Sequence, residues 1–187
     1  MRFYVSQKKM SDSSQDNPTN AMADRNALRA RIVEAFAGVS LAGGIGLRQA
    51  DGIDSRKPEH VCKFLREGDE KDDWRRIPQV DLARYTSSLS FLDPDGMRFY
   101  LPAFLLADLN GRGGNCTDQF DLLPRLIDLS DHSKQQFSCL SLQQRSVVAD
   151  YLRYVQDQPG HWLYVHRIDY ALESFWDPVP EFSEEDD

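Results

Sequence analysis

The chain has 187 residues, of which 41% are hydrophobic and 28% charged, and its formal net charge is −8 at pH 7. This length suits a single domain, and the hydrophobic content is enough for a core. No run reaches the roughly 18 apolar residues that span a bilayer, so no membrane segment is predicted. The negative charge argues against a nucleic-acid-binding protein, because such proteins usually carry a basic stripe.

The two ends of the sequence differ from its body in composition. Residues 1–22 are polar and rich in Ser, Asp, Asn and Gln, and residues 177–187 hold six acidic residues and no basic one. Neither end offers a periodic apolar face that folding would bury. We therefore predict a disordered N-terminal extension at 1–22, one globular helical domain at 23–178, and an acidic disordered tail at 179–187.

The start of the chain and the cysteines indicate the compartment. No apolar segment typical of a secretory signal follows Met1. The cysteines Cys62, Cys116 and Cys139 are odd in number and far apart, which favours reduced thiols. We therefore predict a cytoplasmic protein.

Motifs for metals and cofactors are absent from the sequence. His161 and His166 are five residues apart, and a pair four apart is needed to place both rings on one helical face. The run Gly43-Gly44-Ile45-Gly46 lacks the Lys-Ser/Thr of a P-loop and the third glycine of a dinucleotide fingerprint. We predict no metal and no cofactor, and interpret the glycines as a connection between helices.

Apolar residues recur at helical spacing in three long stretches, which predict helices at 25–38, 142–156 and 161–176. Ser141 and Gln144 fit a capping box at the start of the second. Shorter helices are predicted at 45–54, 59–67 and 79–87, and residues 115–135 stay unassigned. The fold class is mainly α, a small single domain with long loops and room for a minor short-strand element.

The most apolar run in the sequence surrounds Asp93-Pro94-Asp95-Gly96. Asp, Pro and Gly at these positions are typical of a β-turn, so the chain is expected to reverse there. Pro102 is expected in the first turn of a helix at 102–109, because proline cannot donate a hydrogen bond inside a helix. Residues 98–100 would then form an extended segment that leads into this helix.

This central run, LSFLDPDGMRFYLPAFL, resembles the hallmark of a bacterial protein family of unknown function. Asp72-Asp73-Trp74-Arg75-Arg76-Ile77-Pro78, Gly44–Ala50 and Gln144–Val148 are similar to other recurring blocks of that family. The resemblance extends over about residues 25–176. It implies a small cytoplasmic bacterial domain, and it brings no assigned activity or catalytic residue to this chain.

Five residues are candidates for binding. Asp72 and Asp73 belong to an acidic run at 67–73, which is either a solvated loop or a docking edge anchored by Trp74. A single tryptophan is more often part of the core. Arg98 either forms an ion pair that braces the turn at 93–96 or recognises a carboxylate or phosphate with its planar guanidinium, and Tyr100 is a candidate beside it.

Two classes of function remain open. The first is a protein-binding module, such as an immunity-type or antitoxin-type partner of a bacterial toxin or an adaptor, and its partner would be basic. The second is an enzyme whose site is assembled from loops around Arg98 and the turn at 93–96. The small size, the acidity and the missing catalytic motifs favour the first.

Overall fold

The structure, a computed structural model, describes residues 18–111, 122–158 and 160–177. These residues form helices and no strand, which confirms the mainly α prediction. Residues 1–17 of the predicted extension at 1–22, the predicted tail at 179–187 and Cys116 lie outside the described residues, so the division into domains stays a prediction. The elements are α1 (Pro18–Ala35), α2 (Leu47–Asp54), α3 (Glu59–Glu67), η1 (Trp74–Arg76), α4 (Gln79–Arg84), η2 (Thr86–Phe91), α5 (Pro94–Gly111), α6 (Leu122–Ile127), α7 (Asp131–Gln136), α8 (Leu142–Gln156), α9 (Val165–Ala171) and η3 (Leu172–Trp176).

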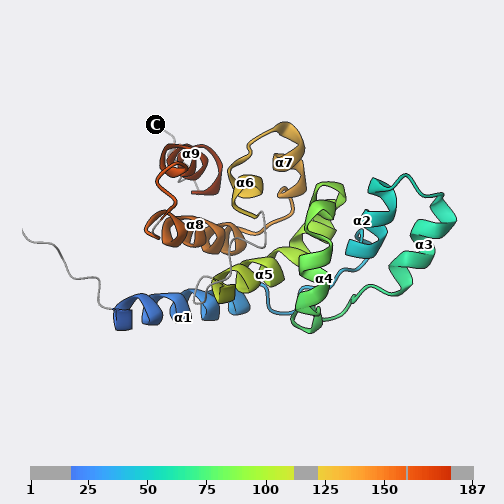
Figure 1. The fold of residues 1–187 in the computed structure, drawn as a ribbon, viewed down its shortest axis with the longest axis horizontal. Helices are drawn as coiled ribbons and strands as arrows, with labels where there is room; N and C mark the ends of the chain where they lie inside the picture. Colours follow the sequence, from blue (N-terminus) through green and yellow to red (C-terminus); the bar gives the residue numbers. More distant parts are fainter. Residues whose placement is uncertain (1–17, 112–121, 159, 178–187) are drawn as a thin grey trace, which may run out of the picture.

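Helix α5 lies in the middle of the molecule (Figure 1). Helices α1 and α8 pack against each other, and α1 also packs on α5. Helices α6, α7 and α9 gather beside α8, whereas the α2–α3 hairpin forms the opposite end, beyond α4 (Figure 1). Helix α3 packs mainly on α2, and α2 packs on η2. The packing of α2 on η2 is therefore the main helix–helix contact between the hairpin and the rest of the molecule.

The long predicted helices at each end of the core are confirmed. Helix α1 buries Leu28 and Ile32, and Phe36 is buried directly after its end. The helix runs from Pro18 to Ala35, whereas 25–38 was predicted. Helix α8 has the predicted bounds and begins with the predicted capping box. The Gln144 N–H donates to Ser141 Oγ at 3.2 Å, and the Ser141 N–H donates to Gln144 Oε1 at 3.1 Å.

The prediction for the central run was wrong about the turn at 93–96, about residues 98–100 and about the place of Pro102 in its helix. Residues 93–96 do not reverse the chain; they begin α5, which runs unbroken from Pro94 to Gly111. Asp93 is the N-cap residue, and its Oδ1 accepts the Gly96 N–H at 2.9 Å. A type I turn and the first turn of a helix share similar dihedral angles, so Asp-Pro-x-Gly suits both. The segment at 98–100 is consequently helical rather than extended.

Pro102 lies inside α5, where a proline typically costs about 3 kcal/mol. Twelve residues of this helix are buried, and they occupy all of its sides. A helix that is apolar all round belongs in a core. We infer that this burial offsets the missing hydrogen bond at Pro102 and keeps the helix continuous.

The loop before α2 touches the first turn of α5. A Cβ on Gly96 would lie 2.4 Å from the Ile45 carbonyl oxygen, and one on Gly44 would lie 2.7 Å from the Gly96 nitrogen. A hydrogen bond also holds the loop against the helix, because the Asp93 Oδ1 that caps α5 accepts the Ile45 N–H at 2.9 Å as well. These glycines therefore permit close packing between a loop and a helix, and Gly96 needs no positive φ for it.

The last predicted helix begins later than expected. Residues 162–164 form a turn, and α9 starts at Val165. Ile168 and Trp176 are buried as predicted, but Trp162 is 73% exposed. Helical spacing placed Trp162 on the buried face, and this assignment fails because the helix does not extend to it.

The contact at Gly96 yields a test of the packing. Gly96→Ala should lower the free energy of unfolding by about 1–3 kcal/mol, because the new methyl group meets the backbone of Ile45. Gly43→Ala is the matched control, since a Cβ there has nothing within 4 Å. Urea unfolding of both variants measures the difference. Equal stabilities for the two variants would show that the loop does not lie against α5.

Candidate functional site

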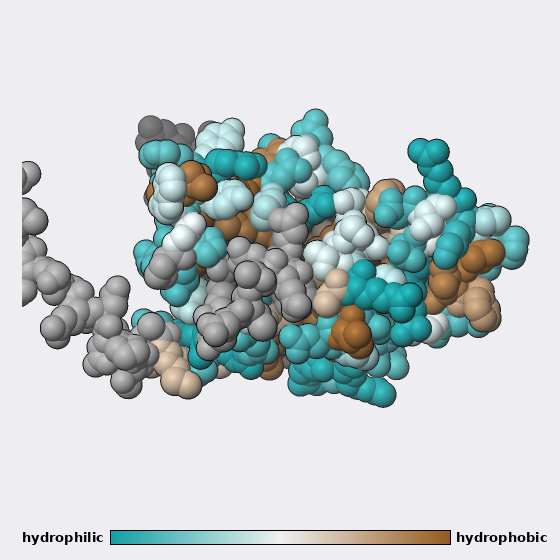
Figure 2. Space-filling model, in the orientation of Figure 1, coloured by the Kyte–Doolittle hydropathy of each residue, from teal (hydrophilic) through white to brown (hydrophobic). Residues whose placement is uncertain are grey.

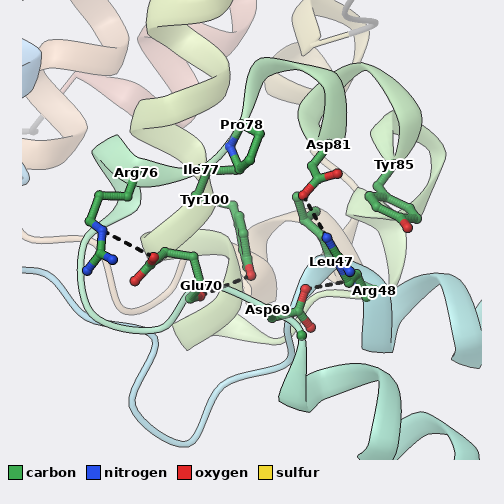
Figure 3. Close-up of a pocket in the computed structure, with 11 residues that line it drawn as sticks. Leu47, Arg48, Asp69, Glu70, Arg76, Ile77, Pro78, Asp81, Tyr85 and Tyr100 are labelled. Carbon is green, nitrogen blue, oxygen red and sulfur yellow. Dashed lines mark hydrogen bonds and ion pairs between the residues drawn. The ribbon is translucent and has the colours of Figure 1, made fainter.

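A cleft of about 270 Å³ lies between the α2–α3 hairpin and the segment from η1 to α5. Its walls come from five places in the chain, and Figure 3 shows the side chains that converge there. We call it the Tyr100 cleft, and it is lined by Leu47, Arg48, Gly68, Asp69, Glu70, Arg76, Ile77, Pro78, Asp81, Tyr85 and Tyr100.

Asp69 is the buried carboxylate of the Tyr100 cleft. It is 9% exposed, and it accepts the backbone N–H groups of Arg48 at 2.9 Å and Gln49 at 3.4 Å. Asp69 thus caps α2 from a distant loop, where the helix dipole also favours a negative charge. Burial raises the pKa of this carboxyl, and the two backbone donors oppose that rise only in part.

Gly46 explains why a carboxylate can reach the start of α2. A Cβ at this position would lie 2.0 Å from Asp69 Oδ2. Only glycine leaves room for the carboxylate against the backbone at this point. Gly46 and Asp69 therefore fix the position of one wall of the cleft relative to the other.

Arg48 links α2 to α4 across the cleft. Its Nη2 donates to Asp81 Oδ2 at 3.1 Å (Figure 3), and the two side chains are 40% and 21% exposed. This hydrogen bond raises the pKa of Arg48, which stays protonated at any physiological pH. A half-exposed pair of this kind holds the geometry more than it stabilises the fold.

Glu70 is held by the loop that carries it. Its Oε1 accepts the N–H groups of Lys71 at 3.1 Å, Asp72 at 3.0 Å and Asp73 at 3.2 Å. These backbone donors, with that of Asp72 first, lower the pKa of Glu70. The other carboxylate oxygen lies 3.6 Å from Arg76 Nε (Figure 3), so the Arg76 pair is loose.

Tyr100 comes from α5 and forms the floor of the cleft. It is 1% exposed, and its O–H donates to the Glu70 carbonyl oxygen at 3.5 Å. Burial raises the pKa of Tyr100, with the charge of Asp69 acting in the same direction. The phenol therefore stays protonated and offers a neutral hydroxyl beside two carboxylates. Tyr100 is the one sequence-predicted binding residue that lines this cleft.

The acidic docking edge predicted at 67–73 has a different structure from the one expected. Trp74 is 3% exposed and donates its indole N–H to the Phe36 carbonyl oxygen at 2.8 Å. It lies in the core, as a single tryptophan more often does. Asp73 caps η1 and forms an ion pair with Arg75 Nε at 2.8 Å, whereas Asp72 is exposed. Glu70 and Asp73 of the acidic run thus form hydrogen bonds within their own loop.

Arg98 lies away from the Tyr100 cleft. Asp93 accepts from Ile45 and Gly96, and Arg98 forms no ion pair with it in the described part of the chain. Arg98 Nε is buried without a hydrogen-bond partner among the described residues. Within the described residues, Arg98 thus forms no ion pair with Asp93 or Asp95, and Asp93 caps a helix instead.

Sequence reasoning missed Arg48, Asp69, Asp81 and Tyr85 as a group. Asp69 stood in the acidic run that the sequence singled out, but nothing marked it as buried. Arg48 and Asp81 are 33 residues apart and meet only through packing. No local pattern carries such a pair, so the sequence alone could not have assembled this cleft.

Charged side chains make up nearly half of the lining of the Tyr100 cleft. Three carboxylates and two guanidinium groups line it, and no His, Cys, Ser, Thr or Lys is among the described residues that do so. The side chains of the cleft that can bind or release a proton are therefore its carboxyl groups and its tyrosines. The described residues also hold no group of three or more His, Cys, Asp or Glu placed to bind a metal ion.

A protein family matches most of this chain. Its description is "Family of unknown function (DUF6714)", and it matches residues 24–179. No curated protein and no solved structure matches the chain. Among the described residues, no helix is both long and apolar enough to cross a membrane.

The two neighbouring carboxylates Asp69 and Asp73 give a test by pH. An acid whose pKa is raised by folding binds its proton more tightly in the folded state, so its contribution to stability falls as pH rises. The free energy of unfolding of the wild type minus that of Asp69→Asn should therefore decrease between about pH 4 and pH 7. Urea unfolding across this range measures it.

Asp73→Asn is the matched control with the opposite sign. The hydrogen bond from Arg75 lowers the pKa of Asp73, so the stability that Asp73 contributes is present above the ordinary carboxyl pKa and is lost in acid. The wild-type minus Asp73→Asn difference should then increase as pH rises towards the ordinary carboxyl pKa. The same slope for both variants would contradict the burial of Asp69.

Proposed function

Because the chain belongs to this family of unknown function, we propose a function from the site: a protein-binding module that takes a basic side chain of its partner into the Tyr100 cleft. The observation that carries the proposal is the lining of the cleft. Asp69, Glu70 and Asp81 outnumber Arg48 and Arg76 there, and two tyrosines provide apolar walls.

The size of the cleft supports a side chain as the occupant. Its volume of about 270 Å³ is smaller than the roughly 300–1,000 Å³ of ordinary small-molecule sites. An arginine or lysine side chain is slender and needs both a carboxylate and an apolar wall along its stem. Tyr85 and Tyr100 provide such walls, and the face of a tyrosine ring also attracts a cation.

The loose ion pair at the rim supports a cation as the ligand. Arg76 is 67% exposed and lies 3.6 Å from Glu70, so this pair stabilises the folded chain by no more than about 1 kcal/mol. A partner cation that reaches Glu70 directly can replace Arg76 at little cost. On binding, Glu70 would thus exchange its contact with the exposed Arg76 for a contact with a partner cation inside the cleft.

The cellular setting is part of the proposal. We place the protein in the bacterial cytoplasm, as an immunity-type or antitoxin-type partner of a toxin or as an adaptor. Its acidic composition, with a net charge of −8, would speed encounter with a basic partner. The acidic residues act in this scheme through the cleft and through the overall field, rather than through Trp74.

A bulky substitution in the cleft wall tests the site. Gly68 is exposed and has helical dihedral angles, and the atom nearest to a Cβ there would be Nη1 at the flexible end of Arg48, at 3.1 Å, with the Leu65 carbonyl oxygen at an ordinary 3.6 Å. Gly68→Trp should fill the cleft and weaken partner binding by about tenfold or more. Gly43→Trp is the matched control on an open surface. The partner is captured from the native host, purified, and measured by surface plasmon resonance.

Three outcomes decide between the possibilities. Loss of binding in Gly68→Trp but not in Gly43→Trp supports the cleft. Equal binding by the two variants would place the partner on another surface and overturn the site. Failure of the wild-type protein to capture any protein from its host would count against the binding function itself.

A charge substitution tests the chemistry separately. Glu70→Gln combined with Asp81→Asn should slow association and reduce its dependence on salt, because both carboxylates face the cleft. Asp72→Asn removes an exposed charge outside the cleft and should change the rate less. Association rates measured across a salt series report the effect. A rate that is unchanged by the double substitution would show that the partner is not recognised by its positive charge.

A further inference from the structure

A second cavity lies where α1, η1, α4 and α5 meet, and its volume is about 200 Å³. Helix α5 packs against α1, η1 and α4 (Figure 1), and the cavity is lined by residues of all four. Ile77 lines this cavity and the Tyr100 cleft alike, so the two are neighbours along the segment from η1 to α4. We call the second cavity the Arg29 pocket.

Small side chains of α5 leave space in the Arg29 pocket. Ala103 and Ala107 line it, and they are 7% and 5% exposed. Residues four apart lie on one face of a helix, so longer side chains at these two positions would fill the hollow. The described apolar residues that line the pocket are Trp74, Ile77, Leu82, Ala103, Leu106 and Ala107.

The outer surface offers fewer apolar contacts than this hollow. On the face of the molecule that Figure 2 shows, brown surface forms only small, separate areas between teal and white ones. Apolar side chains gathered in a hollow give a ligand more contact than the same side chains scattered singly over a surface. The lining of the Arg29 pocket thus suits a ligand with an apolar part.

The polar side chains of the Arg29 pocket differ in charge from those of the Tyr100 cleft. Two guanidinium groups, Arg29 and Arg75, and two amides, Gln79 and Asn110, line it. No Asp or Glu is among the described residues that do so, although the chain as a whole has a net charge of −8. The pocket therefore favours an anion, whereas three carboxylates line the Tyr100 cleft.

The two guanidinium groups differ in how far their charge is already balanced. Arg75 donates from Nε and Nη2 to the carboxylate of Asp73, at 2.8 Å and 2.9 Å. Arg29 donates from Nη1 to the neutral amide oxygen of Asn110, and it forms no ion pair with a described residue. One unbalanced guanidinium calls for a single negative charge. Its planar N–H groups match the geometry of a carboxylate.

Arg29 has a structural role as well. Its hydrogen bond to Asn110 joins α1 to the last turn of α5, where the helix dipole favours a cation. That role requires neither the hollow nor the second guanidinium group beside it, and both are present. We propose that the Arg29 pocket binds a small amphipathic carboxylate, with the head group paired to Arg29 and a short apolar chain against Ala103 and Ala107.

This site is separate from the Tyr100 cleft, and it takes a ligand of the opposite charge. Its volume is below the roughly 300–1,000 Å³ of drug-sized sites, which limits the ligand to a short chain. The test therefore needs no protein partner, and its result does not depend on the function proposed for the Tyr100 cleft.

Binding of hexanoate to the full-length chain tests the proposal by nuclear magnetic resonance. Trp74 lines the pocket and donates its indole N–H to the Phe36 carbonyl oxygen, whereas the indole N–H of Trp176 donates to Leu126. In ¹H–¹⁵N correlation spectra at constant ionic strength, hexanoate should shift the Trp74 indole signal saturably and leave that of Trp176 in place. 1-Hexanol, which has the same chain and no charge, should bind about tenfold more weakly or less.

Three variants separate the charge from the hollow. Arg29→Gln keeps a donor for Asn110, and it should weaken hexanoate binding by about tenfold without changing that of 1-hexanol. Arg25→Gln is the matched control, because it removes the same charge one turn earlier on α1 and Arg25 does not line the pocket. Ala107→Leu fills the hollow and should weaken both ligands, and its circular dichroism spectrum reports whether it is folded.

The outcomes that would overturn the proposal are distinct. No saturable shift of the Trp74 signal with hexanoate would show that the pocket takes no such ligand. Equal affinities of the wild type for hexanoate and 1-hexanol, or of Arg29→Gln and Arg25→Gln for hexanoate, would show that the carboxylate is not recognised. Wild-type affinity in a folded Ala107→Leu would place the ligand elsewhere, and if that variant does not fold, the two arginine variants decide.

Discussion

The Tyr100 cleft depends on how closely the loop at 41–46 approaches the first turn of α5. One carboxylate oxygen of Asp93 accepts two N–H groups, that of Gly96 in α5 and that of Ile45 in the loop, each at 2.9 Å. Gly44 and Gly96 leave no side chain in the way. A single cap therefore starts the central helix and positions the chain that enters α2.

The same loop is also tied to the α3 side of the hairpin. Arg66 donates to the carbonyl oxygens of Gly44 at 3.0 Å and Ala42 at 2.8 Å. The Leu41 N–H donates to the Lys71 carbonyl oxygen at 2.8 Å. Since α3 packs mainly on α2, these polar contacts decide where the hairpin sits. They act together with the apolar packing of α2 on η2, through which Leu47 and Ala50 join the core.

The position of α2 depends on the charge of Asp69, whose carboxylate accepts the first N–H groups of that helix. A buried carboxylate at a helix start is favoured by the dipole and the capped N–H groups, and disfavoured by the loss of water. Burial is the larger effect on its pKa. Asp69 closes one wall of the cleft, and under the proposed function it is also one of the charges that a basic ligand would meet. Ligand binding would then be coupled to the position of the hairpin through this side chain.

The sequence predicted those helices that have a capping motif or a long apolar periodicity within their own residues. Ser141 and Gln144 marked the start of α8, and the apolar spacing at 25–38 predicted α1, which buries Leu28 and Ile32. It failed at Asp93, where turn and helix start use the same residues, and at Trp162, where helical spacing continues beyond the helix. Residues 115–135 gave too short a pattern, since α6 and α7 have six residues each.

The site was less predictable than the fold, for a physical reason. Tyr100 was found because it lies in the apolar central run. Asp69, Asp81 and Arg48 owe their roles to contacts between helices that are distant in sequence, and a carboxylate buried by such contacts looks the same in sequence as one in solvent. Propensity and periodicity describe single elements, whereas a cleft is a property of several elements packed together.

Hydrogen exchange of backbone amides in Asp93→Ala measures most directly whether this one cap positions the hairpin. Exchange should become faster at Gly96 and Ile45, which lose their acceptor, and at Arg48 and Gln49, which depend on the loop for their contact with Asp69. Amides in the middle of α8, such as that of Val148, should keep their protection. Faster exchange at Gly96 alone, with Ile45, Arg48 and Gln49 unchanged, would show that α5 and the α2–α3 hairpin are not joined through Asp93.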